Sequence, residues 1–195
     1  MKPRTFFWAV IMALGLAGPL LRAGAAAVFT DQTQNTGNTF SAAACFGIAC
    51  DNFESGGWSG GDGWLWDWWH EGDSAVTTLG TPQEGAYHLR LRTGYGYVDR
   101  AADMSGQSDA HLQFWAKVVS FESGDFMDLL VGPSSSMTVV KTWTNADSDG
   151  IYHFVDIDLS PYTMSSELYV AFDAQMSGTG DQFYVDDLAM RVVPP

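Results

Sequence analysis

Short stretches of alternating or β-branched residues recur from residue 74 to residue 193. Gly, Pro, Ser, Asp and Asn separate these stretches, and no window shows the sustained 3.6-residue periodicity of a capped helix. Many short strands at this spacing are typical of an antiparallel β-sandwich or barrel, so the pattern predicts an all-β fold. The expected strands are Ser74–Leu79, Ala86–Arg92, Tyr97–Met104, His111–Val119, Phe126–Val131, Met137–Trp143, Tyr152–Leu159, Glu167–Ala174 and Gln182–Val193.

The N-terminus has a different pattern. Lys2 and Arg4 precede an apolar run from Phe6 to Leu21, which small residues follow. This order is typical of a cleaved secretory signal peptide, and the run is too short and too often interrupted by Gly and Pro for a membrane span. We expect residues 1–27 to be the signal peptide, residues 28–50 an extended N-terminal segment, and residues 51–195 the folded domain. The mature chain is then secreted, and it is extracellular or attached to the cell surface, with no span left after cleavage.

The excess of acidic over basic residues indicates which classes of partner the chain can bind. The chain has 9 Lys and Arg against 23 Asp and Glu, and three of those bases lie within the first 27 residues. Nucleic acid is therefore not an expected partner, because affinity for the phosphate backbone depends on basic side chains. The excess of acid is compatible with a divalent cation or a neutral ligand, and it also suits a merely soluble surface.

A short resemblance lies just after the expected cleavage region. Phe29-Thr30-Asp31 and Asn38-Thr39-Phe40-Ser41-Ala42 resemble the start of secreted proteins of the camelysin and TasA group. Some members of that group form fibres, and a dedicated signal peptidase releases them. The resemblance covers about twenty residues and implies an export route. It also raises the alternative that the chain is a structural subunit of an extracellular fibre or biofilm matrix, assembled through this segment.

Cys45 and Cys50 are the only cysteines and are separated by four residues. In an exported protein, a local disulfide between them is the default expectation. Two free thiols, or a bond between chains, are the alternatives.

A second resemblance covers almost all of residues 51–193. DNFESGGWSGGDGW (51–64) and FYVDDLAM (183–190) bracket the domain, with EGAYHLRLR (84–92) and HLQFWAKV (111–118) inside it. In this order and spacing, the four segments resemble jelly-roll β-sandwich modules of the carbohydrate-binding type and the related MAM-like domains. The resemblance implies a structural Ca²⁺ held by Glu54, Glu84 and Asp186, with the backbone carbonyl of Tyr87. Asp186 is preferred over Asp187 because neighbouring side chains on a strand face opposite sides. The alternative is that these acids are solvated loop charges.

A tryptophan cluster, at positions 58, 64, 66, 68 and 69, is the main candidate for ligand binding. An extended chain would place Trp64, Trp66 and Trp68 on one face and Trp69 on the other. Core packing is the competing interpretation, since Trp is mostly buried. Because five such residues in twelve are more than the edge of a core usually takes, we expect Trp66 and Trp69 to be exposed. The expected ligand-binding residues are Trp66, Trp69, Asp67 and His70.

Nothing in the sequence points to an enzyme. The four histidines are scattered without a zinc-binding spacing, and no nucleophile elbow occurs. Pairs of carboxylates arise by chance among 23 acids. The sequence therefore favours a secreted, non-catalytic module that binds a polysaccharide or another cell-surface component and is stabilised by calcium.

Overall fold

The structure is a computed structural model that describes residues 47–162 and 164–192. It consists of nine strands and one short 3₁₀ segment, Asn145–Asp147. The strands are β1 (Ala49–Asp51), β2 (Trp69–Thr77), β3 (His88–Ala102), β4 (Ala110–Val119), β5 (Phe126–Gly132), β6 (Thr138–Thr144), β7 (His153–Asp158), β8 (Leu168–Met176) and β9 (Gln182–Val192). Every strand pairing is antiparallel, which confirms the predicted all-β class.

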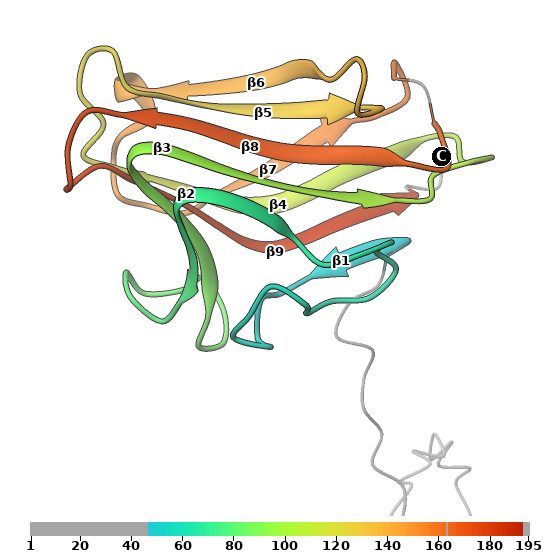
Figure 1. Ribbon diagram of the computed structural model, residues 1–195, viewed down its shortest axis with the longest axis horizontal. Coiled ribbons are helices and arrows are strands. Elements are labelled where there is room, and N and C mark those ends of the chain that lie inside the picture. The colour runs from blue at the N-terminus through green and yellow to red at the C-terminus, as the bar shows by residue number, and fades with distance from the viewer. Residues whose placement is uncertain (1–46, 163, 193–195) are drawn as a thin grey trace, which may run out of the picture. The chain divides into compact units, whose positions relative to one another are not determined.

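The strands form two layers of a jelly-roll β-sandwich, shown in Figure 1. The first layer has the order β6-β5-β8-β3-β2 and the second has the order β3-β9-β4-β7, with β1 beside β9. Strand β3 belongs to both layers, because residues 94–102 pair with β8 and residues 89–92 pair with β9. Thr93 and Gly94, where β3 changes layer, both have positive φ. The strand bends there without ending.

Aromatic rings join the two layers. Phe172 of β8 lies across the sandwich from Phe114 of β4 and Phe183 of β9, with ring centroids 5.4 and 6.3 Å apart. Trp143 of β6 packs on Phe183 at 4.9 Å. All four side chains are buried. The inward positions of both layers thus form one core, which fixes the outward positions of each strand by alternation.

Most of the expected strands are present with small shifts at their ends. The two expected strands Ala86–Arg92 and Tyr97–Met104 are one strand, β3, because Gly94 lies at a bend and not in a turn. Strand β1 was not expected, and it pairs with β9 from Ala49 onward, so the sheet begins before the expected boundary at Asp51. The expected signal peptide, most of the 28–50 segment and Cys45 lie outside the described residues. The Cys45–Cys50 disulfide therefore stays a prediction. No helix in the described part of the chain is long and apolar enough to cross a membrane.

Candidate functional site

The outer surface of the first layer carries aromatic and acidic side chains together. On β3, β5 and β8, the inward residues Val98, Met127 and Phe172 are buried, so their sequence neighbours face outward. We call this surface the aromatic–acidic face, and it consists of Trp66, Trp69, Glu71, Tyr95, Tyr97, Asp99, Phe126, Asp128, Tyr169 and Asp173.

Strand register aligns part of this face into a row. Glu71 of β2 lies opposite Tyr97 of β3, which lies opposite Asp173 of β8. Asp173 in turn lies opposite Asp128 of β5, whose Oδ1 accepts a 2.5 Å hydrogen bond from the hydroxyl of Thr142 on β6. Because strands are about 4.8 Å apart, the row runs for roughly 19 Å across the layer. Hydrogen-bonding groups thus extend in a line perpendicular to the strands.

A hollow of about 850 Å³ lies on this face where β2 begins, β3 ends and β8 begins. Its lining includes Trp66, Trp69 and Tyr169, and it also contains Asp67, Asp99, Trp68 and Ser134. The rings of Trp66 and Tyr169 are 5.8 Å apart. Trp69 is 58% exposed and Trp66 is 40% exposed. Two large aromatic rings are therefore open to solvent beside carboxylates, an arrangement suited to stacking on a flat apolar surface that also bears hydroxyl or amino groups.

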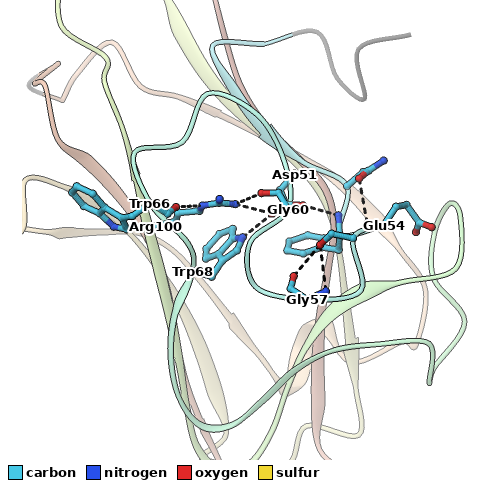
Figure 2. Close-up of polar contacts among 10 residues, drawn as sticks. Asp51, Glu54, Gly57, Gly60, Trp66, Trp68 and Arg100 are labelled. Carbon is cyan, nitrogen blue, oxygen red and sulfur yellow. Dashed lines mark hydrogen bonds and ion pairs between the residues drawn. The ribbon is translucent and has the colours of Figure 1, made fainter. Parts of the chain in front are cut away.

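A buried ion pair holds the tryptophan segment against this layer, as Figure 2 shows. Arg100 points inward from β3, and its Nη1 donates to Asp51 Oδ2 at 2.8 Å and to the carbonyl of Gly60 at 2.7 Å. Its Nε donates to the carbonyl of Trp66 at 2.6 Å. The indole nitrogen of Trp68 donates to the same Asp51 oxygen at 2.9 Å. The position of Trp66 at the hollow therefore follows from a charge inside the sandwich.

Burial disfavours the charged forms of Asp51 and Arg100, and their hydrogen bonds and mutual attraction oppose this effect. Burial raises the pKa of Asp51, while the bonds from Trp68 and Phe53 and the charge of Arg100 lower it. Burial likewise lowers the pKa of Arg100, and Asp51 acts against that shift. Each charge depends on the other, because a buried ion without its partner costs several kcal/mol.

On the aromatic–acidic face, burial and neighbouring negative charges raise the pKa of two carboxylates. Burial raises the pKa of Asp173, and the charge of Asp128 raises it further. Burial also raises the pKa of Asp99, which the charge of Glu71 raises further and the hydrogen bond from Tyr97 lowers. These carboxylates repel one another across the strands.

The predicted ligand-binding residues are only partly brought together. Trp66 and Trp69 are exposed, as expected, and both line the hollow with Asp67. His70 faces away from it and stacks on Trp58 at 4.1 Å. The expected common face of Trp64, Trp66 and Trp68 is wrong, because this segment is not a strand: Trp68 is buried and Trp66 is exposed. Sequence reasoning missed Tyr97, Asp99, Asp128, Tyr169 and Asp173, whose only signal was their place on the polar side of predicted strands.

The predicted metal-binding residues converge through backbone amides. Glu54 Oε1 accepts from the amides of Ala86 and Tyr87 at 2.9 and 2.8 Å. Gly85, at φ +63°, allows this approach, because a Cβ there would overlap the Glu54 carboxylate. Asp186 Oδ2 accepts from the amides of Gln83 and Glu84 at 2.8 and 3.3 Å. The opening segment, the 78–87 loop and the closing strand do meet, as expected.

Asp187 occupies the place that strand alternation assigned to Asp186. The register between β4 and β9 shifts by one residue here, and Asp187 has φ +48°. Such a bulge breaks the alternation of side chains. As a result, Asp186 is fully buried, while Asp187 lines a pocket of about 190 Å³ with Glu54, Glu84, Asn52 and Gly85. Across residues 47–162 and 164–192, no three His, Cys, Asp or Glu side chains are gathered closely enough to hold a metal ion.

A buried polar network fixes the 78–87 loop on the second layer. Lys117 Nζ lies over the rings of Tyr152 and Tyr184 and donates to the carbonyls of Gly80 and Thr81. His88 is fully buried, and its two ring nitrogens contact the hydroxyl of Tyr152 at 2.5 Å and the carbonyl of Leu79 at 2.6 Å. The carbonyl requires an N–H donor, so a neutral ring with Nε2–H and an accepting Nδ1 satisfies both contacts.

A second hollow of about 500 Å³ lies over β6 and β7. Trp143 in its lining is 4% exposed. The lining also includes Phe154, which is 53% exposed. The hollow on the aromatic–acidic face is the stronger candidate, because two exposed indole rings, Trp66 and Trp69, line it together with Tyr169.

The fold has relatives among solved structures. A carbohydrate-binding module of family 61, solved in complex with β-1,4-galactotriose, has a TM-score of 0.55 at 14% identity, covering 73% of this chain and 94% of that one. A xylan-binding domain of family 22 has a TM-score of 0.51 at 15% identity, covering 76% and 96%. The adhesin domain K2 of Lys-gingipain also has a TM-score of 0.51 at 15% identity, covering 71% and 96%. No family model and no curated protein matches the sequence. These likenesses support the jelly-roll β-sandwich fold.

Removing one partner of the buried ion pair is expected to destabilise the domain strongly. Asp51→Ala leaves the Arg100 charge buried, and we expect it to lower the free energy of unfolding by about 3–5 kcal/mol. Urea unfolding followed by tryptophan fluorescence measures this. His153→Ala is the matched control, because it breaks the 2.7 Å contact between His153 Nε2 and the Asp149 carboxylate, whose side chains are 63% and 46% exposed. That loss should be about 0–1 kcal/mol. Equal losses for the two variants would contradict the role of Arg100.

His88 is expected to remain neutral in mildly acidic solution. Burial and the charges of Lys117 and Arg90 outweigh the hydrogen bond to the Leu79 carbonyl, and together they lower the pKa of His88 from 6.5 to about 4. Between these two pKa values the folded state binds fewer protons than the unfolded state. The contribution of His88 therefore lowers the free energy of unfolding as the pH falls from 6.5 towards about 4. An NMR titration of the His88 Cε1 proton, assigned with His88→Gln, measures the midpoint. A midpoint near 6.5 would show that the ring is not held in this network.

Proposed function

We propose that this chain is an exported, non-catalytic β-sandwich module that binds a glycan through its aromatic–acidic face. One observation carries the proposal: Trp66, Trp69 and Tyr169 line an open hollow next to carboxylates on one sheet face. Aromatic faces stack on the apolar faces of sugar rings, and carboxylates accept hydrogen bonds from their hydroxyls. The likeness to modules whose structures include a galactotriose complex and a xylan-binding domain supports this class of ligand.

Two parts of the proposal rest on residues outside the described range. Export depends on the signal-like residues 1–27 and on the camelysin- and TasA-like segment that follows them. The alternative function, a fibre or matrix subunit, depends on residues 28–44. Both remain predictions from the sequence, whereas the glycan-binding proposal draws on described side chains.

Truncating the exposed tryptophans is expected to remove binding. We expect Trp69→Ala and Trp66→Ala each to weaken binding to a responsive polysaccharide by about tenfold or more, since burying such a ring is worth roughly 1.5–3 kcal/mol. Affinity electrophoresis against immobilised galactan, xylan and other glycans provides the measurement.

Phe154→Ala is the control for the tryptophan variants. Phe154 is 53% exposed on β7 and lines the second hollow, so this change removes an exposed aromatic ring that does not belong to the aromatic–acidic face. It should leave binding unchanged. A protein whose binding survives both tryptophan changes, or is lost with Phe154→Ala, would overturn the assignment of the face.

We also propose that Ca²⁺ binds in the pocket of Glu54, Glu84 and Asp187, with the Asn52 amide. Hard carboxylate and amide oxygens are the donors that calcium prefers, and they come from three separate segments. Burial raises the pKa of Asp187, and the charges of Glu84 and Glu54 raise it further, so a cation there relieves repulsion. The carboxylates are too far apart to hold an ion as they stand, so binding requires them to move together.

Calcium is expected to raise the melting temperature of the protein. At a concentration of 100 times its dissociation constant, it would stabilise the folded state by about 2.7 kcal/mol, or several degrees. We expect Glu84→Gln and Asp187→Asn to remove this shift in differential scanning fluorimetry, and Asn is well suited to the left-handed backbone at residue 187. Glu122→Gln, at an exposed site elsewhere, should retain it. If millimolar calcium leaves the melting temperature of the unchanged protein where it was, the site does not exist.

A further inference from the structure

The aromatic–acidic face has a one-sided charge. Glu71, Asp99, Asp128 and Asp173 lie on it, and Asp67 lines the hollow at its end. Within residues 47–162 and 164–192, no Lys, Arg or His side chain belongs to this face. The six bases of this part of the chain lie elsewhere: Arg90, Arg92, Arg100, Lys117, Lys141 and Arg191.

The placement of those bases shows that they do not neutralise the face. Arg100 is turned inward to Asp51, and Lys117 is covered by Tyr152 and Tyr184. Lys141 is opposite the buried Leu129 and lies over the ring of Trp143. Each of these cations already has a partner. Arg90 and Arg92 pair with Asp73, and the charge of Arg191 acts on Asp187. No Lys or Arg of the described residues therefore compensates the acids of the face.

The acids also face one another directly. Asp173 and Asp128 are cross-strand partners, as are Tyr97 and Asp173 in the same row. Like charges opposite each other destabilise a sheet. The mutual effect is visible in the raised pKa of Asp173, to which the charge of Asp128 contributes. Because both carboxylates are only half-buried, a ligand that brings positive charge to them would relieve this repulsion.

The distribution of the carboxylates argues against a simple ion. Glu71, Asp173 and Asp128 lie in a row that spans three strand spacings, or roughly 14 Å. Within residues 47–162 and 164–192, no three His, Cys, Asp or Glu side chains form a group that could hold a metal ion. A linear polymer with repeated positive groups matches this distribution better than a point charge does. The exposed rings of Trp66 and Trp69, in the hollow beside the row, match a polymer made of sugar rings.

We propose that the glycan bound by the aromatic–acidic face carries free amino groups, as in a chain of partly or fully de-acetylated glucosamine units. The ammonium groups lie beside Glu71, Asp99, Asp128 and Asp173, and the sugar rings stack on Trp66 and Trp69. Glycans rich in uronic acids are rejected, because their carboxylates meet those of the protein without a cation between them. This inference rests on the proposed function and specifies its ligand.

Three matched oligosaccharides test the charge preference. Isothermal titration calorimetry of the full exported chain compares a glucosamine oligomer, the N-acetylated oligomer of equal length and an oligogalacturonate, at mildly acidic pH where the amines are protonated. We expect the amino oligomer to bind at least tenfold more tightly than the acetylated one, and the uronate not to bind. The preference should shrink as salt is added, because exposed charges are screened.

Two variants separate charge from stacking. Asp128→Asn and Asp173→Asn each keep the shape of the row but remove one of its carboxylate charges, and each should reduce the preference for the amino oligomer over the acetylated one. Trp69→Ala should weaken both. Asp158→Asn, on β7 of the second layer, is the charge control and should keep the preference.

The outcomes distinguish this inference from the function on which it rests. If the acetylated or uronate oligomer binds as tightly as the amino oligomer, with binding still lost in Trp69→Ala, the charge inference is wrong and the glycan-binding function stands. If no oligomer and no polysaccharide of the wider panel binds, both are wrong. If the preference is unchanged in both Asn variants, the row is not its source.

Discussion

The ion pair between Asp51 and Arg100 is the contact on which the arrangement of the binding face depends. It joins the end of the first strand to the C-terminal part of the longest one, and both of its side chains are buried. Its remaining hydrogen-bonding capacity is used by Gly60, Trp66 and Trp68, which all belong to the irregular segment between β1 and β2. That segment has little regular structure of its own, so a buried charge replaces the backbone ladder that a strand would have supplied.

Strand β3 links this buried charge to the exposed face. Arg100 points into the sandwich, and Asp99 next to it points outward into the hollow. The same alternation places Val98 in the core and Tyr97 in the polar row. A change in register of one residue would exchange these positions, putting Asp99 inside and Arg100 outside. The core, the ion pair and the exposed acids therefore specify the register together.

The sequence was sufficient to predict elements whose physics is local. Alternation revealed most strands, and the density of tryptophan predicted that Trp66 and Trp69 are exposed. The row of Tyr97, Asp128 and Asp173 could not be predicted from the sequence, because it depends on which strands are neighbours and on the register in which they pair. Gly94 between two stretches of alternating residues predicts a turn, but β3 continues through it, because glycine at positive φ is found in turns and in strand bends alike. Asp187 was missed because a bulge has no reliable signature in a single sequence.

The acidic side chains of this chain occur in two arrangements, and each arrangement suits a different kind of ligand. Glu54, Glu84 and Asp187 come from separate segments that converge on one small pocket, where their charges act on a common point. Asp128 and Asp173 sit on rigid neighbouring strands, which hold them at a fixed spacing and prevent them from gathering. Convergent carboxylates suit a single ion, whereas carboxylates held along a sheet suit an extended partner. The net charge of −14 therefore says little by itself, and the backbone that carries each acid decides what that acid can bind.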